Sequence, residues 1–159
     1  MGYRLITLAV GFLACGAYGL ARQDASIPFP ADYRKWTHVK STLVGPDSPA
    51  FARNGGYHHF YANAAAMDGY RTGTFADGSI LIDDGLEAVT TGGVATEGTR
   101  RRVAVMVKDS ARFRDSQGWG FEVFLRDERK GSLTAEARAA CLACHQKAER
   151  NLVFSRFRE

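Results

Sequence analysis

Side chains in the second half of the chain alternate with a period of two, and this feature limits the fold more than any other. The stretch RRRVAVMVKDS, which begins at Arg100, has a valine at three alternate positions, and in WGFEVFLRD the residues Trp119, Phe121 and Val123 share one face while Glu122 lies on the other. This period is typical of half-buried β-strands. The connections are too short for parallel crossovers, and the 17 glycines argue against a helix bundle. We therefore expect an α+β fold, mainly antiparallel β-sheet with peripheral helices and a C-terminal helix.

Two further strands are expected upstream of this region. YHHFYAN predicts a strand that ends at a helix cap, Asn63, and AAAMDGY predicts the short helix that follows. A turn at Asp77 and Gly78 then leads into an apolar strand from Ile80 to Ile82, and LEAVTTGGVATEG forms its far arm and loop.

Nearer the N-terminus the pattern changes. We expect a short helix over residues 31–39, with Trp36 and Val39 on one face, because Pro28 and Pro30 mark a turn before it. The glycines and prolines of residues 43–56 predict a loop.

The clearest helix lies near the C-terminus and contains CLACH. Alanines dominate its first half and Thr134 is placed to cap it. Cys141, Cys144 and His145 stand at i, i+3 and i+4, so their side chains leave a helix within about 100° of one another. C-x-x-C-H is the attachment motif of a c-type haem, in which two thiolates bond the porphyrin and the histidine is the proximal iron ligand. We therefore expect one covalent haem c per chain, with His145 as the metal ligand, on a C-terminal haem-binding helix.

Three other interpretations of the two cysteines fit the sequence less well. A disulfide between Cys141 and Cys144 would close almost no loop and stabilise little. A zinc site needs a second ligand pair, and no cysteine or histidine follows His145. A thioredoxin-like pair normally opens a helix after a strand, whereas these cysteines lie inside an alanine-rich helix.

The first 21 residues predict export. One positive charge precedes a mostly apolar run that ends in small residues, which is typical of a secretory signal peptide cleaved after Ala21. A membrane anchor is disfavoured by three glycines in the run, and a lipoprotein signal at Cys15 is the weaker alternative. We expect residues 22–159 to form a single domain in the periplasm.

The charge balance says little about partners. The net charge is +4 and the pI is near 9.1. The cluster Thr99–Arg102 is interpreted as a solvated strand end, so no nucleic-acid partner is expected. The sequence does not indicate a redox partner protein.

The sixth coordination position of the iron is left open by the sequence. An electron-transfer cytochrome usually adds a second protein ligand, yet neither methionine nor histidine follows His145. A six-coordinate electron carrier would need an upstream ligand, and the candidates are Met67, Met106, His38, His58 and His59. Without one, the iron would be five-coordinate and open to a small ligand.

Several segments together resemble the cytochrome P-460 and cytochrome c′-beta family. They are FPADYRKW, YHHFYAN, GTFADGSILI, VMVKDSARF, GWGFEVF and the terminal ACLACHQ…LVFSRF, in this order along the chain. The resemblance implies an antiparallel sheet with peripheral helices, a homodimer and a five-coordinate c-type haem. Members of the family either oxidise hydroxylamine or bind nitric oxide and related gases.

One departure from the family pattern bears on activity. Hydroxylamine-oxidising members carry a porphyrin-linked lysine where this chain has Asp83, and a carboxylate cannot form that bond. This favours a periplasmic gas-binding cytochrome, with hydroxylamine or nitric oxide oxidation as the alternative; whether the protein is an enzyme stays open. An enzyme would use Glu122 or Asp83 as the proton acceptor. The aromatic candidates for the haem pocket are Phe60, Phe75 and Phe121.

Overall fold

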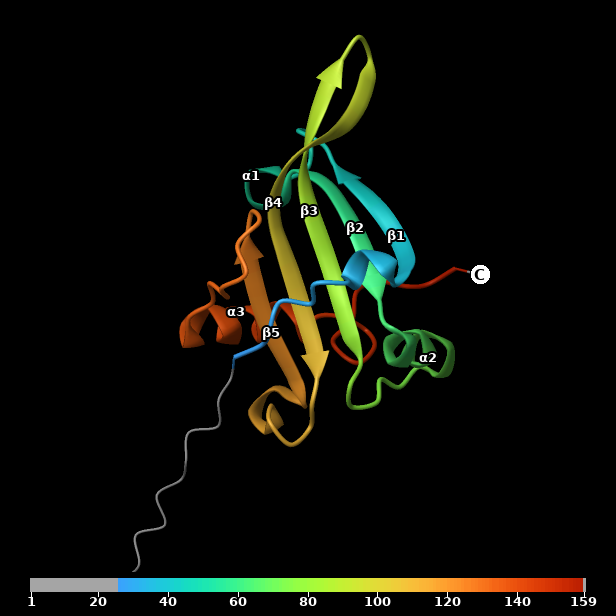
Figure 1. The fold of residues 1–159 in the computed structure, drawn as a ribbon, viewed down its shortest axis with the longest axis vertical. Coiled ribbons are helices and arrows are strands. Elements are labelled where there is room, and N and C mark those ends of the chain that lie inside the picture. Colours follow the sequence, from blue (N-terminus) through green and yellow to red (C-terminus); the bar gives the residue numbers. More distant parts are fainter. Residues whose placement is uncertain (1–25, 159) are drawn as a thin grey trace, which may run out of the picture.

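The computed structural model describes residues 26–158, and it consists of one five-stranded antiparallel sheet with helices at its periphery (Figure 1). The strands pair in sequence order as a meander: β1 (Thr37–Val44), β2 (Gly56–Ala62), β3 (Ile80–Thr91), β4 (Val94–Lys108) and β5 (Trp119–Leu125). The helices are α1 (Phe51–Asn54), α2 (Ala64–Thr72) and α3 (Ala135–His145), and two 3₁₀ turns are η1 (Tyr33–Lys35) and η2 (Arg114–Ser116). The predicted α+β class and the C-terminal helix are confirmed.

The predicted signal peptide, residues 1–21, and Cys15 within it lie outside the described residues. Within residues 26–158, no helix is both long enough and apolar enough to span a membrane.

The sheet buries apolar side chains on both faces. The face that carries α2 and α3 holds the α3-side core, and the opposite face, crossed by η1, holds the η1-side core. The α3-side core consists of Val39, Ala62, Ala66, Met67, Phe75, Leu81, Trp119, Phe121, Leu152 and Val153. The η1-side core consists of Ile27, Tyr33, Ile82, Val103, Val105, Phe113 and Phe124. The alternation along β4 and β5 therefore divides residues between two cores, as the period of two requires.

The η1-side core is closed by a buried carboxylate. Asp84 on β3 has a fully buried side chain, and it accepts hydrogen bonds from the Tyr33 hydroxyl at 2.7 Å, from Arg34 Nη2 at 2.8 Å and from Arg100 Nε at 3.0 Å. These bonds fasten the N-terminal segment to the sheet, because a buried carboxylate is stable only when its oxygens are paired.

Strands β3 and β4 continue past the rest of the sheet as a projecting hairpin (Figure 1). Its turn is Gly92-Gly93, and both residues have positive φ, 58° and 81°. A two-residue hairpin loop of this twist needs left-handed backbone at both positions, which glycine adopts without strain.

Two expectations about the N-terminal third are wrong. The helix predicted over residues 31–39 is only the 3₁₀ turn η1, and Thr37 begins strand β1, whose backbone groups pair with β2. Trp36 and Val39 consequently pack on opposite faces of the sheet. The loop predicted over residues 43–56 includes the end of β1, helix α1 and the start of β2. Sheet pairing, a long-range interaction, overrides the local helical pattern.

The remaining expected elements are present. Asn63 caps α2 by accepting a hydrogen bond from the Ala66 amide at 3.0 Å, and Thr134 caps α3 through the Ala137 amide at 3.3 Å. The predicted strands at YHHFYAN, RRRVAVMVKDS and WGFEVFLRD correspond to β2, β4 and β5.

Candidate haem site

Helix α3 places both cysteines and the histidine on its last turns. Cys141 is half-buried against the α3-side core, Cys144 is exposed, and both are free thiols. Burial raises the pKa of the Cys141 thiol, with the nearby Cys144 and Glu122 acting in the same direction. The three side chains therefore leave one helix beside the sheet, as the i, i+3, i+4 spacing predicts.

The imidazole of His145 is held in one orientation. Its Nδ1 lies 2.7 Å from the backbone carbonyl oxygen of Leu152, and its ring centroid lies 5.1 Å from that of Phe121 and 5.2 Å from that of Phe154. A carbonyl oxygen only accepts, so Nδ1 donates and Nε2 is left as the lone-pair nitrogen. Leu152 has positive φ, 63°, in the turn that presents this carbonyl.

These residues fit a c-type haem. Two unpaired thiols share a helix with an imidazole whose tautomer suits metal binding through Nε2, and the hydrogen bond on the other nitrogen is the usual support of a ligating histidine. Among residues 26–158, His, Cys, Asp and Glu side chains form no group of three that could hold a metal ion by themselves.

The three aromatic candidates occupy different places. Phe121 on β5 contacts the His145 ring, so it lies beside the expected proximal ligand. Phe60 on β2 lies on the same sheet face, half-buried, with Lys40 Nζ 5.8 Å from its ring centroid. Phe75 packs edge-on against Trp119 within the α3-side core. Only Phe121 is brought directly to the imidazole.

Glu122 is buried, but its carboxylate is already engaged. Its Oε1 accepts hydrogen bonds from the backbone amides of Val123 at 3.0 Å and Leu133 at 2.9 Å, and its Oε2 pairs with Arg138 of α3. Gly131 lies so close that a Cβ there would be 2.4 Å from the Glu122 carboxyl carbon. These contacts fasten α3 and its preceding loop to β5, which favours an anchoring role over proton acceptance.

Asp83 belongs to a charged cluster on the sheet face that carries α3. Its Oδ1 lies 2.8 Å from His58 Nδ1, and its Oδ2 lies 3.5 Å from Arg102 Nη2. Asn54 completes the cluster, since its carbonyl oxygen is 2.7 Å from His58 Nε2 and its Oδ1 is 3.1 Å from Arg102 Nη2. We call these four residues the Asp83 cluster.

His58 is the proton-carrying member of the Asp83 cluster. Both of its ring nitrogens face oxygen acceptors, so both donate and the ring is an imidazolium. The hydrogen bond that His58 donates to Asp83 raises the pKa of His58, against the opposing effect of burial. The sequence indicated His58 only as a candidate axial ligand. It did not indicate that Asn54 and Arg102 contact His58 and Asp83, because β2, β3, β4 and α1 meet here only in the folded chain.

The other upstream candidates for a sixth ligand are divided between the two faces. Met67 belongs to the α3-side core and Met106 packs against it. His38 contacts Tyr61, which packs against the η1-side core, and His59 follows the same alternation along β2. The Asp83 cluster already uses both nitrogens of His58.

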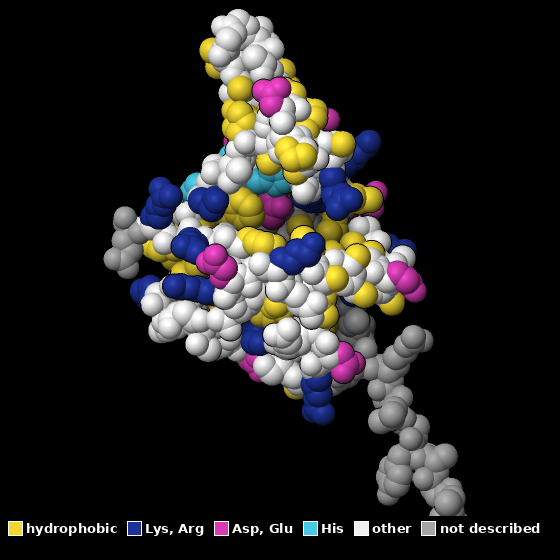
Figure 2. Space-filling model, turned by 180° about the vertical axis from the view of Figure 1, so that it is seen from behind, with side chains coloured by type: hydrophobic (Ala, Val, Ile, Leu, Met, Phe, Trp, Pro, Cys, Tyr) yellow, Lys and Arg dark blue, Asp and Glu magenta, His cyan; other side chains and the backbone are white. Residues whose placement is uncertain are grey.

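The molecule is hollowed on the side that carries α3. Figure 2 shows a depression below the projecting hairpin, in which an acidic side chain lies next to histidine, apolar and basic side chains. Small residues stand on the α3-side face of the middle strands, namely Ala62 on β2, Gly85 on β3 and Ala104 on β4, and the side chains of Arg102 and His58 lie beside Gly85.

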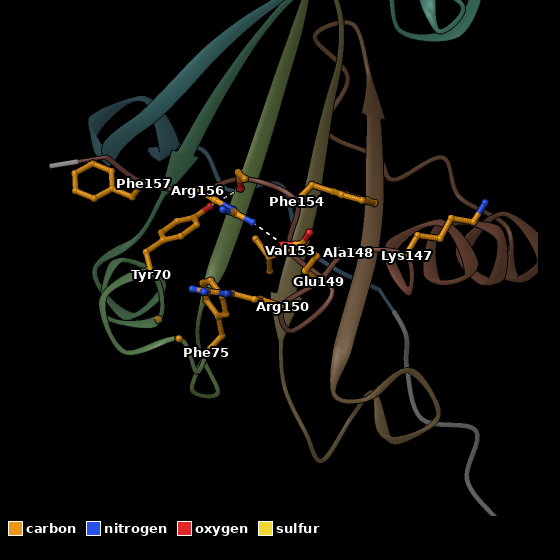
Figure 3. Close-up of a pocket in the computed structure, with 13 residues that line it drawn as sticks. Tyr70, Phe75, Lys147, Ala148, Glu149, Arg150, Val153, Phe154, Arg156 and Phe157 are labelled. Atoms are coloured by element: carbon orange, nitrogen blue, oxygen red, sulfur yellow. Dashed lines mark hydrogen bonds and ion pairs between the residues drawn. The ribbon is translucent and has the colours of Figure 1, made fainter.

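A second cavity, of about 390 Å³, lies between α2 and the C-terminal segment (Figure 3). The aromatic side chains of Tyr70, Phe75, Phe154 and Phe157 line it together with Lys147, Arg150 and Arg156. The Tyr70 hydroxyl is hydrogen-bonded to Ser155 Oγ at 2.6 Å. None of the CLACH residues lines this cavity, but Phe154, which contacts the His145 ring, does.

A family model described as Cytochrome P460 matches residues 30–155. No curated protein sequence matches the chain.

Proposed function

The chain belongs to the cytochrome P460 family, whose members carry haem, and from this we propose that it is a periplasmic monohaem cytochrome that binds nitric oxide or a related small nitrogen ligand. The observation that carries the proposal is the pairing of His145 Nδ1 with the Leu152 carbonyl on the helix that holds Cys141 and Cys144. In this proposal the cysteines bind the haem covalently and His145 is the proximal ligand.

A haem with one open axial position supplies reversible binding of small ligands such as nitric oxide. The chain's own residues prepare that position. The Leu152 carbonyl fixes the tautomer and angle of the His145 ring, and Phe121 and Phe154 pack against that ring.

Five-coordination is supported by the placement of the alternative ligands. Both nitrogens of His58 are hydrogen-bonded, and His38 and His59 project from the face opposite α3. The two remaining candidates, Met67 and Met106, lie on the α3-side face. A six-coordinate electron carrier would therefore need a methionine now packed in or against the core.

The optical spectrum of the ferrous holoprotein, with and without nitric oxide and carbon monoxide, tests the proposal. A high-spin spectrum that changes with both gases is expected. A low-spin spectrum indifferent to carbon monoxide would instead identify a six-coordinate electron carrier. Export is tested separately by fractionation of the native host. The mass of the mature protein should correspond to a chain that begins at Arg22 after cleavage.

Hydroxylamine or nitric oxide oxidation is the second candidate function. The Asp83 cluster favours this function because oxidation of hydroxylamine releases protons, and His58 in the cluster can hold a proton on the same sheet face as His145. Turnover of hydroxylamine with an electron acceptor separates an enzyme from a binding protein. The homodimer expected from the family resemblance is tested by light scattering of the holoprotein.

A further inference from the structure

The Asp83 cluster has more positive than negative charge. Arg102 and the His58 imidazolium face one carboxylate, Asp83, and Lys40 adds a third cation on the same face. The side chains of Asp83 and Arg102 are each about one-fifth exposed, 21% and 22%, whereas that of His58 is 8% exposed. A net positive charge that is largely withdrawn from water attracts anions more strongly than an exposed one.

Arg102 also has hydrogen-bond donors to spare. Its Nη2 contacts Asn54 and Asp83, but within residues 26–158 neither its Nε nor its Nη1 has a hydrogen-bond partner. Asn54 and Asp83 hold one edge of the guanidinium, so the remaining N–H groups keep a defined direction. A guanidinium with a fixed orientation and free N–H groups suits a small planar oxyanion.

The cluster stands on the same face as the tether helix. On β4, Met106 pairs with Phe121, which contacts the His145 ring. Arg102 lies four residues before Met106 on the same strand. At about 3.4 Å per residue, this separates the Arg102 backbone from the level of Phe121 by roughly 13 Å. Ala104 lies between the two positions on the same strand.

We propose that Arg102, positioned by Asp83 and Asn54, selects small nitrogen oxyanions for the ligand site, so that the protein takes up an anion of the nitrite type as well as a neutral gas. This inference rests on the proposed haem site and deepens it by naming a ligand class. The binding step is an association and transfers no electron.

Titration of the ferric holoprotein with sodium nitrite, followed by its absorption spectrum, tests the proposal. Arg102→Gln should weaken nitrite binding about tenfold, which corresponds to about 1.4 kcal/mol. Asn54→Ala, which removes the side-chain amide at the end of α1, should weaken it about threefold and keeps the test open if Arg102→Gln does not fold. Arg114→Gln, on the exposed turn η2, removes the same charge far from the cluster and should leave the nitrite affinity unchanged.

Carbon monoxide binding to the ferrous protein is the matched neutral readout. It should change less than twofold in all three variants. Nitrite affinity that is unchanged in Arg102→Gln, or in Asn54→Ala where the first variant is unfolded, would overturn the inference, as would an equal loss of carbon monoxide affinity. If the wild-type protein binds neither gas, the proposed function itself fails. If the wild type binds both gases and the variants bind nitrite as tightly as the wild type, only the inference about Arg102 fails.

Discussion

Replacing His58 by Gln should destabilise the protein in a pH-dependent way. In the folded protein His58 Nδ1 donates to Asp83 at 2.8 Å and Nε2 donates to the Asn54 carbonyl at 2.7 Å, so the substitution removes a largely buried cation from two acceptors. Arg102 remains 3.5 Å from Asp83 and continues to compensate its charge.

The magnitude follows from the contacts that are lost. A hydrogen bond that involves a charged group is worth about 1.5–3 kcal/mol, and the partial exposure of Asp83 and the remaining Arg102 pair place the expected loss near 2 kcal/mol at acid pH. For a domain of this size, about 3 °C per kcal/mol gives a melting temperature lowered by roughly 6 °C.

The sign of the pH dependence is fixed by the direction of the pKa shift. The pKa of His58 is raised above its ordinary value of 6.5, chiefly by the Asp83 hydrogen bond. The folded state therefore holds the proton more tightly than the unfolded state, and the stabilisation is complete below about pH 6.5. It is lost as the pH rises through the raised pKa of the folded protein, because the neutral ring then has one donor for two acceptors.

The assay is thermal unfolding of the holoprotein and of the His58→Gln variant from about pH 5.5 to about pH 9, a range that brackets the ordinary histidine pKa. His38→Gln is the matched control, since His38 is exposed on the other face and should give no comparable pH-dependent difference. The reasoning would be refuted by a difference between wild type and His58→Gln that is constant with pH or grows as the pH rises.

Three further outcomes are expected. Replacing Cys141 and Cys144 together by Ala should leave a denatured chain without the added porphyrin mass, while each single replacement leaves one thioether bond; porphyrin retained by the double variant would exclude the proposed attachment. Burial, together with the hydrogen bond to Asp84, raises the pKa of Tyr33 to about 12, so wild type and Tyr33→Phe should give the same ultraviolet tyrosine titration until the pH approaches 12, and a difference near pH 10, the ordinary phenol value, would contradict this. Asp84→Asn should lower the free energy of unfolding by about 3 kcal/mol in urea titrations, since it leaves Arg100 without its buried counter-charge, and a loss below about 1 kcal/mol would show that the buried pairing contributes little.

The C-terminal helix with its two thiols and imidazole could be predicted from the sequence alone. Thr134 begins the helix, and Cys141, Cys144 and His145 share one side of it because residues three and four apart are neighbours on any α-helix. The strands β2, β4 and β5 were predictable for the same reason, since the alternation of side chains is a local property of the chain.

The tertiary structure alone decided which residues accompany that helix. Asp83 was identified by its place in a family pattern, but its partners His58, Arg102 and Asn54 come from two other strands and a short helix. Because Glu122 has a carboxylate on a strand, the sequence indicated it as a candidate proton acceptor. In the structure it lies against Gly131 and pairs with Arg138, so it fastens α3 and the preceding loop to β5. The start of β1 was likewise decided by pairing with β2. Local periodicity determines an element and its faces, while strand register determines which distant side chains meet, and register depends on the packing of the whole sheet.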